Sequence, residues 1–366
     1  MQVMPSQLVP GCILLKDVWG KTNHPIIPKN TVLLDIHIEI LKAFLVDTVE
    51  VSTQLNNGEL FEPESVDAAS EEEQITGNQW DTDKTKSPFQ NHYEEAVKGY
   101  KELFKSWQSG MSLDILHVRK LIIPLLERTE DIDEAVTLLH QYGKKEEYLY
   151  YHSVAVAILS SYLARKLGYS KGEWLQIGIA GLLSDSGMSR IDPKIVFKKG
   201  SLQQHELEEI KKHPTLSYRL VEQTSSLTAG VKLAIIQHHE RFDGSGYPLG
   251  VPMDKIHKYA QIVGICDSYH AMTSERLYKA KQSPFKVIEE LQKSEFTKFD
   301  SAIVHKFVSS IADFPIGTKV RLTNDQTGEI IFIEPSKPTR PIVKLDGTGE
   351  IISLQNMPNV HLEARV

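Results

Sequence analysis

The sequence predicts a mainly α-helical protein with a small β-rich module at each end. Between residues 93 and 314, apolar residues recur at spacings of three and four, which is the period of an amphipathic helix. Residues 1–55 and 315–366 instead carry short apolar or β-branched runs separated by Gly, Pro and Asn, a pattern typical of strands and turns. With 366 residues, the chain is long enough for two or three domains and at least one sizeable core.

The first module, residues 1–55, is predicted to contain three short strands and one helix. Strands are expected at 11–15, 31–34 and 46–51, and the helix at 36–45. Gly, Pro and Asn between these runs favour turns. The module is therefore predicted to be β-rich or of mixed α+β type.

Residues 56–92 are predicted to be an acidic linker. Nine acidic residues and no Lys or Arg lie between Glu59 and Asp83, so this segment has little apolar surface to bury. The formal net charge of −7 is concentrated here, because 41 basic and 39 acidic residues remain elsewhere. The rest of the chain is nearly neutral, so its charge is compatible with an anionic ligand.

Residues 93–145 are predicted to form a helical region with three helices. Apolar residues at helical spacing begin the first helix at Tyr93. Ser112 is a candidate N-cap for the second helix, and Pro124 is expected to kink or end it. The third helix is expected at 132–142, before Gly143.

Residues 146–314 are predicted to be almost entirely helical. The expected helices are 153–167, 174–183, 206–223, 231–240, 259–274, 284–293 and 301–312. The chain then returns to strand patterns in residues 315–366. The expected strands are 319–322, 329–333, 342–345 and 350–353, which indicate a small barrel or meander.

Histidines are concentrated in the helical part of the chain. Eight of the 14 lie between His140 and His270. Neutral imidazole and carboxylate groups are preferred ligands of zinc, iron and manganese. A single His on a helix is more often a packing or surface residue, so spacing alone leaves both interpretations open. The candidate ligands, most of them at or near the end of a predicted helix, are His152, Asp185, His213, His238, His239 and Asp267.

One continuous string favours the metal site. Residues 238–248 read HHERFDGSGYP, in which two glycines allow tight backbone turns and Pro248 restricts Tyr247 to extended conformations. The string resembles the HD-GYP family signature HHExxDGxGYP at every specified position. The resemblance covers 148–314 and includes the strings HSVAVA, KKGSL and CDSYHAMTSERLYK.

The resemblance implies an all-helical HD-type metal-phosphohydrolase domain at residues 146–314. Family members bind two or three metal ions and hydrolyse the bacterial second messenger cyclic di-GMP. By position, all six candidates listed above correspond to metal ligands, with Asp185 as the bridging catalytic carboxylate. Tyr247, Arg276 and Lys279 match residues that contact the dinucleotide phosphates, for which Arg offers a planar fork of donors and Lys a point charge. The implied cofactor is a divalent transition metal: iron, manganese or zinc.

Several positions depart from the family pattern. The His of the family's HD dyad is Ser184, the nearby Lys is Met188, and the second acid of the DxxD-like string is His270. Members with three metals carry Glu where this chain has Tyr148. A Ser hydroxyl is a poor ligand for a divalent transition ion. We therefore expect one firm site and one weakened site, formed respectively by Asp185, His213, His238 and His239 and by His152, Asp185 and Asp267.

Three functional hypotheses follow. The favoured one is a protein of bacterial cyclic-di-GMP signalling that binds metal and cyclic di-GMP, with hydrolysis reduced or lost. The alternative is an active phosphodiesterase that gives the linear dinucleotide or GMP. The third is an interaction protein whose helices at 93–142 form a homodimer or bind a signalling partner.

Other classes are disfavoured by the sequence. No basic patch with interleaved aromatic residues indicates nucleic-acid binding. No apolar run approaches the ~18 residues of a membrane span, and the first 20 residues lack the basic and apolar regions of a signal peptide. Two cysteines cannot form a disulfide framework. We therefore expect a cytoplasmic protein with reduced thiols.

Overall fold

The chain divides into two compact units, Met1–Trp80 and Asp81–Val366. The computed structural model describes residues 1–19, 25–34, 37–38, 41, 48–58, 60–61, 63, 87–276, 281–293, 297–312, 316–334 and 337–365. Most of the expected helix at 36–45, most of the acidic linker at 56–92, and Lys279 lie outside these residues. The domain boundaries expected at residues 55, 92 and 145 remain predictions.

The first unit is built from short antiparallel pairs. β1 (Gln2–Val3) pairs with β4 (Val49–Glu50), and β2 (Val18–Trp19) pairs with β3 (Pro25–Ile27). Isolated bridges join the three predicted strand runs, since Ile13 pairs with Val32 and Leu14 with Val51. The unit's own small core includes the fully buried Leu14, Leu33, Leu41 and Val51. The β-rich prediction is confirmed, although the first two runs form single bridges instead of regular strands.

The second unit starts with helices that begin and end differently from the prediction. They are α2 (Pro88–Gln108), α3 (Ile115–Leu126), α4 (Thr129–Ala135) and α5 (Leu139–Tyr142). α2 begins five residues before Tyr93, because the Ser87 hydroxyl accepts from the Gln90 amide and Pro88 is suited to the first helical position. Asp114 caps α3 in place of Ser112, and Pro124 lies inside that helix without ending it.

The remaining helices form the body of the domain. They are α6 (Tyr148–Lys166), α7 (Lys171–Leu183), α8 (Pro193–Val196), α9 (Gln204–Ile210), α10 (His213–Val221), α11 (Ala229–Gln237), α12 (Lys258–Thr273), α13 (Pro284–Lys293) and α14 (Ser301–Ile311). The prediction of a single helix at 206–223 is wrong. Two helices, α9 and α10, occupy that range, and the second starts with Pro214 near its N-terminus, where the missing amide is tolerated.

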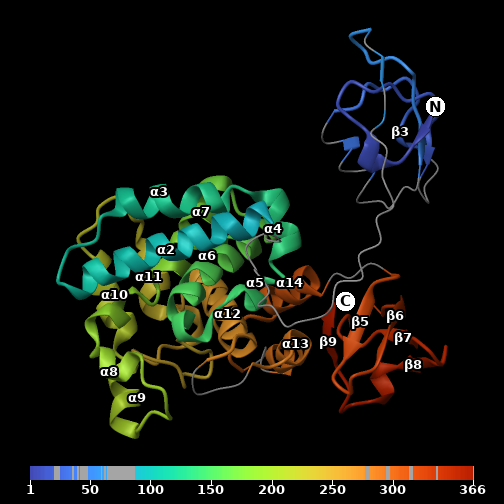
Figure 1. Ribbon diagram of the computed structural model, residues 1–366. Coiled ribbons are helices and arrows are strands. Elements are labelled where there is room, and N and C mark those ends of the chain that lie inside the picture. The colour runs from blue at the N-terminus through green and yellow to red at the C-terminus, as the bar shows by residue number, and fades with distance from the viewer. Residues whose placement is uncertain are drawn as a thin grey trace. The chain divides into compact units, whose positions relative to one another are not determined.

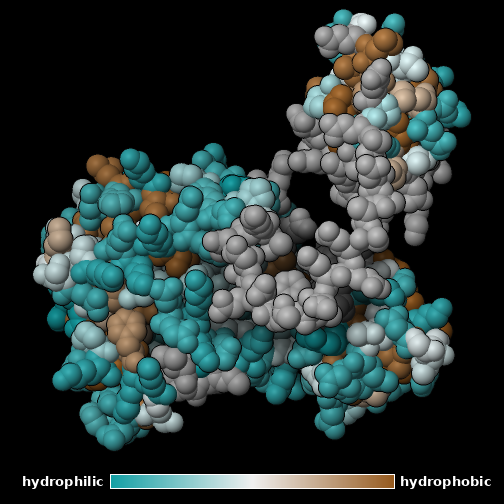
Figure 2. All heavy atoms as spheres, in the orientation of Figure 1, coloured by the Kyte–Doolittle hydropathy of each residue, from teal (hydrophilic) through white to brown (hydrophobic). Residues whose placement is uncertain are grey.

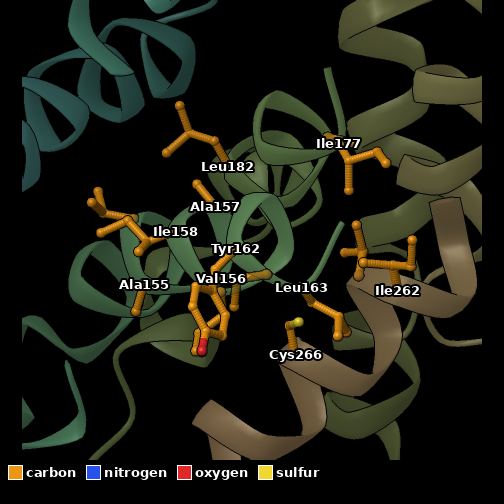
Figure 3. Close-up of a cluster of buried hydrophobic side chains, with 14 of the residues drawn as sticks. Ala155, Val156, Ala157, Ile158, Tyr162, Leu163, Ile177, Leu182, Ile262 and Cys266 are labelled. Atoms are coloured by element: carbon orange, nitrogen blue, oxygen red, sulfur yellow. The ribbon is translucent and has the colours of Figure 1, made fainter. Parts of the chain in front are cut away.

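Helix α6 is the central element of this unit (Figure 1). Every residue from Leu149 to Ala164 is buried, because α2, α3, α7, α12 and α14 all pack against it. A helix that is covered on all sides can carry apolar residues around its whole circumference. In Figure 3, side chains of α6 meet Ile177 and Leu182 of α7 and Ile262 and Cys266 of α12. The ends of these packed helices supply the candidate ligands.

The last part of the chain is an antiparallel five-stranded sheet with the order β8-β7-β6-β5-β9. Its strands are β5 (Lys319–Leu322), β6 (Thr327–Phe332), β7 (Ile342–Leu345), β8 (Ile351–Ser353) and β9 (Leu362–Arg365). The first four match the predicted strands closely and run as a meander. β9 was missed because Leu362 is the one clear apolar signal in a four-residue strand.

The sheet module is attached to α13. Phe285 of that helix belongs to the sheet's apolar core together with Val320 and Leu322. The guanidinium of Arg340 forms an ion pair with Glu289, at 2.6 Å between Nε and Oε1. The sheet module therefore packs against α13, the helix that follows α12.

Polar residues cover much of the visible surface of the helical domain, where they are drawn in teal in Figure 2. Large apolar side chains such as Trp107 and Phe307 are instead fully buried. Within the described ranges, no helix combines the length and the apolar character needed to cross a membrane.

Candidate metal centre

Five helices bring the six predicted ligands to one place. His152 lies in the first turns of α6 and Asp267 lies within α12, whereas Asp185 directly follows α7. His213 begins α10, and His238 and His239 come directly after α11. Five of the six are buried and His239 is partly buried. All six residues singled out in the sequence are therefore brought together.

The position of Asp185 is set by a close contact between two segments. Asp185 precedes the 3-10 turn Ser186–Arg190, which packs against α10. Gly187 allows this approach, because a Cβ there would lie 2.3 Å from the His213 carbonyl oxygen. The Ser217 hydroxyl links the two segments: it accepts from the Gly187 amide at 2.7 Å and donates to the Ser184 carbonyl at 2.6 Å. These contacts fix Asp185 beside His213.

The first cluster consists of Asp185, His213, His238 and His239, each with one ligand atom within 4.8 Å of the others. Asp185 Oδ1 lies 3.1 Å from His213 Nε2 and 3.8 Å from His238 Nε2. The two Nε2 atoms are 3.2 Å apart. Although burial alone would raise it, the neighbouring His213 and His238 rings hold the pKa of Asp185 well below its usual range.

The hydrogen bonds of these two histidines indicate what the cluster can hold. His213 Nδ1 donates to the Ile210 carbonyl and His238 Nδ1 to the Ile235 carbonyl, both at 2.7 Å. A carbonyl only accepts, so each neutral ring carries its proton on Nδ1 and a lone pair on Nε2. In the neutral form of the two rings, two lone pairs and the Asp185 carboxylate thus converge on one place. This donor set fits a divalent transition ion, and the carbonyls orient the rings for it.

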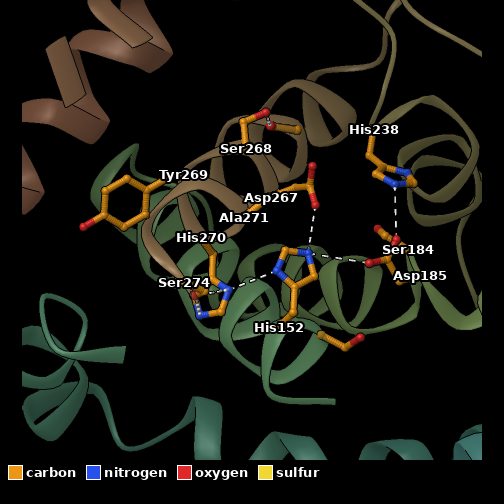
Figure 4. A network of polar contacts seen from close by, with 12 residues as sticks. His152, Ser184, Asp185, His238, Asp267, Ser268, Tyr269, His270, Ala271 and Ser274 are labelled. Carbon is orange, nitrogen blue, oxygen red and sulfur yellow. Dashed lines mark hydrogen bonds and ion pairs between the residues drawn. The ribbon is translucent and has the colours of Figure 1, made fainter. Parts of the chain in front are cut away.

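A second cluster consists of His152, Asp185 and Asp267. His152 Nε2 lies 2.9 Å from Asp267 Oδ1 and 3.5 Å from Asp185 Oδ2 (Figure 4). Asp185 therefore faces the first cluster with Oδ1 and the second with Oδ2, as a bridging carboxylate must. Burial would raise the pKa of Asp267, but the hydrogen bond from His152 lowers it, so that this carboxyl is ionised at neutral pH.

The far side of His152 is occupied by polar side chains. Its Nδ1 lies 2.9 Å from His270 Nδ1 and 3.1 Å from the Tyr148 hydroxyl, and the Tyr148 ring stacks on the imidazole. The Arg276 guanidinium lies 4.6 Å from the centroid of the Tyr148 ring. This His–Tyr–Arg arrangement was not predicted. The only sequence signal was that Tyr148 and His270 replace carboxylates of the family pattern.

Ser184 does not face either cluster with its hydroxyl. Its Oγ donates to the Ala180 carbonyl at 2.7 Å, one turn back along the chain, and the residue is only 3% exposed. A Ser hydroxyl bonded in this way to the backbone of its own helix is common in helices. Of the ligands in the family's second site, this chain therefore offers His152, Asp185 and Asp267 but no side chain from position 184.

The signature string forms a closed loop over the cluster. The buried Glu240 carboxylate accepts from the amides of Leu249 and Val251 at 2.7 and 3.2 Å and so ties both ends of the loop together. At Gly246, a Cβ would lie 2.4 Å from the Arg241 amide nitrogen. The Tyr247 ring is placed 4.6 Å from the His239 ring, between centroids. Burial raises the pKa of Tyr247, which keeps its hydroxyl protonated as a hydrogen-bond donor.

An open cavity of about 240 Å³ lies over both clusters. His152, Asp185, His213, His239, Tyr247, Asp267 and Arg276 line its polar part, whereas Met188, Ile195, Val196, Phe197, Leu202 and Ile210 line an apolar wall. Lys198, which the sequence analysis did not assign, also lines it and pairs with Glu206 at 2.6 Å. Tyr247 and Arg276 therefore share one cavity with the ligands.

Comparison with known proteins finds a matching family model and several relatives of similar sequence. Residues 133–303 match the family model described as HD domain. A cyclic di-GMP phosphodiesterase of Pseudomonas aeruginosa is 30% identical over 244 residues, which are 66% of this chain and 58% of that protein. The cyclic di-GMP phosphodiesterase PdeB of Borreliella burgdorferi is 31% identical over 217 residues, which are 57% of each chain.

A more distant relative acts on another cyclic dinucleotide. The 3'3'-cGAMP-specific phosphodiesterase 3 of Vibrio cholerae is 27% identical over 198 residues, which are 52% of this chain and 43% of that protein. The chain spans just over half the length of the first two relatives. Residues 133–303, which contain the two His/Asp clusters, are an HD domain, and the chain has homologues among cyclic-dinucleotide phosphodiesterases of the HD-GYP type.

Proposed function

We propose that the protein binds one divalent transition ion firmly and binds cyclic di-GMP, with hydrolysis reduced or lost. The ion is held by Asp185, His213, His238 and His239. The observation that carries the proposal is the contrast between the two clusters. The first has four ligands, with two rings already oriented by backbone carbonyls, whereas Ser184 turns its hydroxyl away from the second.

The second cluster supports a weaker site. His152, Asp185 and Asp267 supply three ligand groups, and Asp185 is shared with the first ion. Two-metal hydrolysis uses both ions to hold the scissile phosphate and to activate water between them. Weak occupancy of one position therefore lowers turnover, with a tenfold loss in rate for each ~1.4 kcal/mol of lost transition-state stabilisation. The ions would be iron, manganese or zinc, which suit imidazole and carboxylate ligands.

Ligand binding depends on fewer groups than hydrolysis does. Tyr247 and Arg276 line the cavity beside the metal ligands and offer a hydroxyl and a guanidinium to phosphate oxygens. Lys279 is proposed to join them. The curated relatives named above act on cyclic dinucleotides, which supports cyclic di-GMP as the ligand. Such a protein would report ligand binding to a signalling partner or to a second copy of itself.

An active phosphodiesterase is the second candidate. The observation that favours it is that His152 Nε2 and Asp267 Oδ1 still lie 2.9 Å apart beside Asp185, so that the remaining ligands of the second site are in place. Its products would be the linear dinucleotide or GMP.

One experiment separates the two candidates. Cyclic di-GMP is titrated calorimetrically into the Mn²⁺-loaded full chain, and the same mixture is analysed for products by chromatography after prolonged incubation. The proposal expects saturable binding with little product, and the Arg276→Gln variant is expected to bind at least tenfold more weakly, as lost charge-assisted hydrogen bonds imply. Rapid conversion of the substrate supports the active enzyme instead. An absence of binding contradicts both.

A further inference from the structure

A second, larger cavity lies next to the metal centre, between the helical domain and the sheet module. Its volume is about 500 Å³, within the size range of small-molecule sites. α5, α6, the end of α12 and the segment before α13 form one side, and Arg321 and Glu363 of the sheet form the other. None of the six candidate ligands lines it, so it is distinct from the cavity described above.

The charges around this second cavity are unequal. Arg321 is neutralised by Glu363, with 3.0 Å between Nε and Oε2, and Glu275 faces Lys145 at 3.9 Å. Lys144 and Lys281 also line the cavity, and within the described ranges neither has a carboxylate partner within 4.0 Å. Two unneutralised ammonium groups on one cavity wall favour an anionic ligand.

Neutral polar groups complete the lining. The Gln282 side-chain oxygen Oε1 is buried and, within the described part of the chain, accepts no hydrogen bond. A buried acceptor without a donor costs free energy. A rotation of the Gln282 side chain would turn Oε1 into the cavity, where a ligand hydroxyl or amino group would recover this cost. His140 stands beside Lys281; burial first and the Lys281 charge second lower its pKa to about 4, so its ring is neutral at pH 7.

The second cavity shares a wall with the metal centre. Tyr148 lines both cavities, and His270 lines the second one while its Nδ1 lies 2.9 Å from Nδ1 of the candidate ligand His152. A molecule in the second cavity would therefore lie directly behind the weaker metal cluster.

We propose that this cavity is a binding site for a small phosphate monoester that also carries hydrogen-bond donors, the chemistry of a nucleoside monophosphate. Lys144 and Lys281 bind the phosphate, and Gln282 Oε1 accepts from a hydroxyl or amino group of the ligand. Lysine suits such a phosphate as a mobile point charge. The proposal concerns a site apart from the metal clusters and holds whether or not the protein hydrolyses cyclic di-GMP.

The test is calorimetric titration of GMP into the full chain after metal has been removed with a chelator. Four variants are compared with the wild type: the double variant Lys144→Gln/Lys281→Gln, Gln282→Met, Asp185→Asn and the control Lys211→Gln. Lys211 is a half-buried residue directly after α9 that pairs with Glu208 and lines neither cavity. Thermal unfolding of each variant confirms that it is folded. Guanosine, which lacks the phosphate, serves as a second probe.

We expect one GMP per chain and binding at least tenfold weaker in the double lysine variant, a factor that corresponds to about 1.4 kcal/mol. Gln282→Met is expected to weaken the binding of GMP but not the binding of inorganic phosphate, which is titrated as a third probe. Asp185→Asn and Lys211→Gln are expected to bind GMP as the wild type does, and guanosine to bind much more weakly. The proposal is overturned if the wild type binds no GMP at about 1 mM. It is equally overturned if Asp185→Asn abolishes binding while the double lysine variant retains it, because GMP would then occupy the metal centre. That second outcome leaves the proposed function intact.

Discussion

His213 and His238 face each other with their Nε2 atoms 3.2 Å apart, while the Nδ1 of each ring donates to a backbone carbonyl. When both rings are neutral, the two Nε2 lone pairs face each other, and Asp185 Oδ1 lies 3.1 Å from one of them. This arrangement leaves the lone pairs directed at one point, where a cation relieves their repulsion.

Replacement of one facing ring is expected to remove the firm metal site. His213→Ala deletes one of four ligands and should weaken Mn²⁺ binding by at least tenfold, or about 1.4 kcal/mol, measured by calorimetry. His117→Ala is the matched control, because His117 is an exposed histidine of α3 that belongs to neither cluster. Equal affinities in the two variants would place the ion elsewhere.

Restoring the family's dyad histidine is expected to strengthen the second site. Ser184→His supplies an imidazole next to Asp185, so the number of bound metal ions should rise from one towards two and product formation from cyclic di-GMP should increase. Ser184→Ala loses only the hydroxyl contact with Ala180 and should keep one ion. The Ser184→His variant is tested alone and together with Met188→Lys and His270→Asp. If these variants fold but match Ser184→Ala in the number of bound ions and in product formation, Ser184 does not limit the second site.

Gly187 is expected to be the least replaceable glycine near the site. A methyl group there would lie 2.3 Å from the His213 carbonyl oxygen and 2.4 Å from the Ser217 amide nitrogen, so α10 must shift. Gly187→Ala should lower the free energy of unfolding by about 1–3 kcal/mol and weaken metal binding. Gly172→Ala in α7 meets nothing within 4 Å and should leave both unchanged or raise stability slightly. Urea unfolding measures the free energy of unfolding of both variants. An unchanged value in Gly187→Ala would mean that the segment around Gly187 can shift at little cost.

Acid is expected to destabilise the metal-free protein below about pH 6.5. Burial lowers the pKa of His140 to about 4 and lowers that of His270 as well, so these rings stay neutral in the folded chain. The unfolded chain binds more protons than the folded chain between the lowered and the ordinary pKa, and stability therefore falls as the pH falls through that window. His140→Gln should reduce the pH dependence of the unfolding free energy by up to about 1.4 kcal/mol per pH unit. Unfolding free energies at pH 7 and pH 5 that do not differ would contradict this.

Much of the site could be predicted because its ligands lie in a continuous string or at positions that the family pattern marks. The HHERFDGSGYP string and the Asp residues at 185 and 267 fall in this group. The His–Tyr–Arg arrangement could not be predicted, because Tyr148, His270 and Arg276 meet only through the packing of α6 against α12. The direction of a side chain could not be predicted from the sequence either. Whether the Ser184 hydroxyl points towards the clusters depends on its hydrogen bond to the Ala180 carbonyl.

The helices and strands likewise divide into those that the sequence predicts and those that it does not. Helices with strong periodicity, such as α13, were predicted with their observed bounds, as were β5 and β7. Errors occurred where a local signal was weak or was overlooked. Ser87-Pro88 starts α2 earlier than the apolar pattern does, and β9 depends on pairing with β5, a distant partner that no local pattern reveals.

The count of metal ions retained by the wild-type chain tests the central claim most directly. The full chain is saturated with Mn²⁺, freed of unbound metal by gel filtration, and analysed by elemental mass spectrometry together with its protein concentration. One firm four-ligand cluster and one weakened three-ligand cluster predict close to one ion per chain. Two or more ions per chain, or none, would contradict the account.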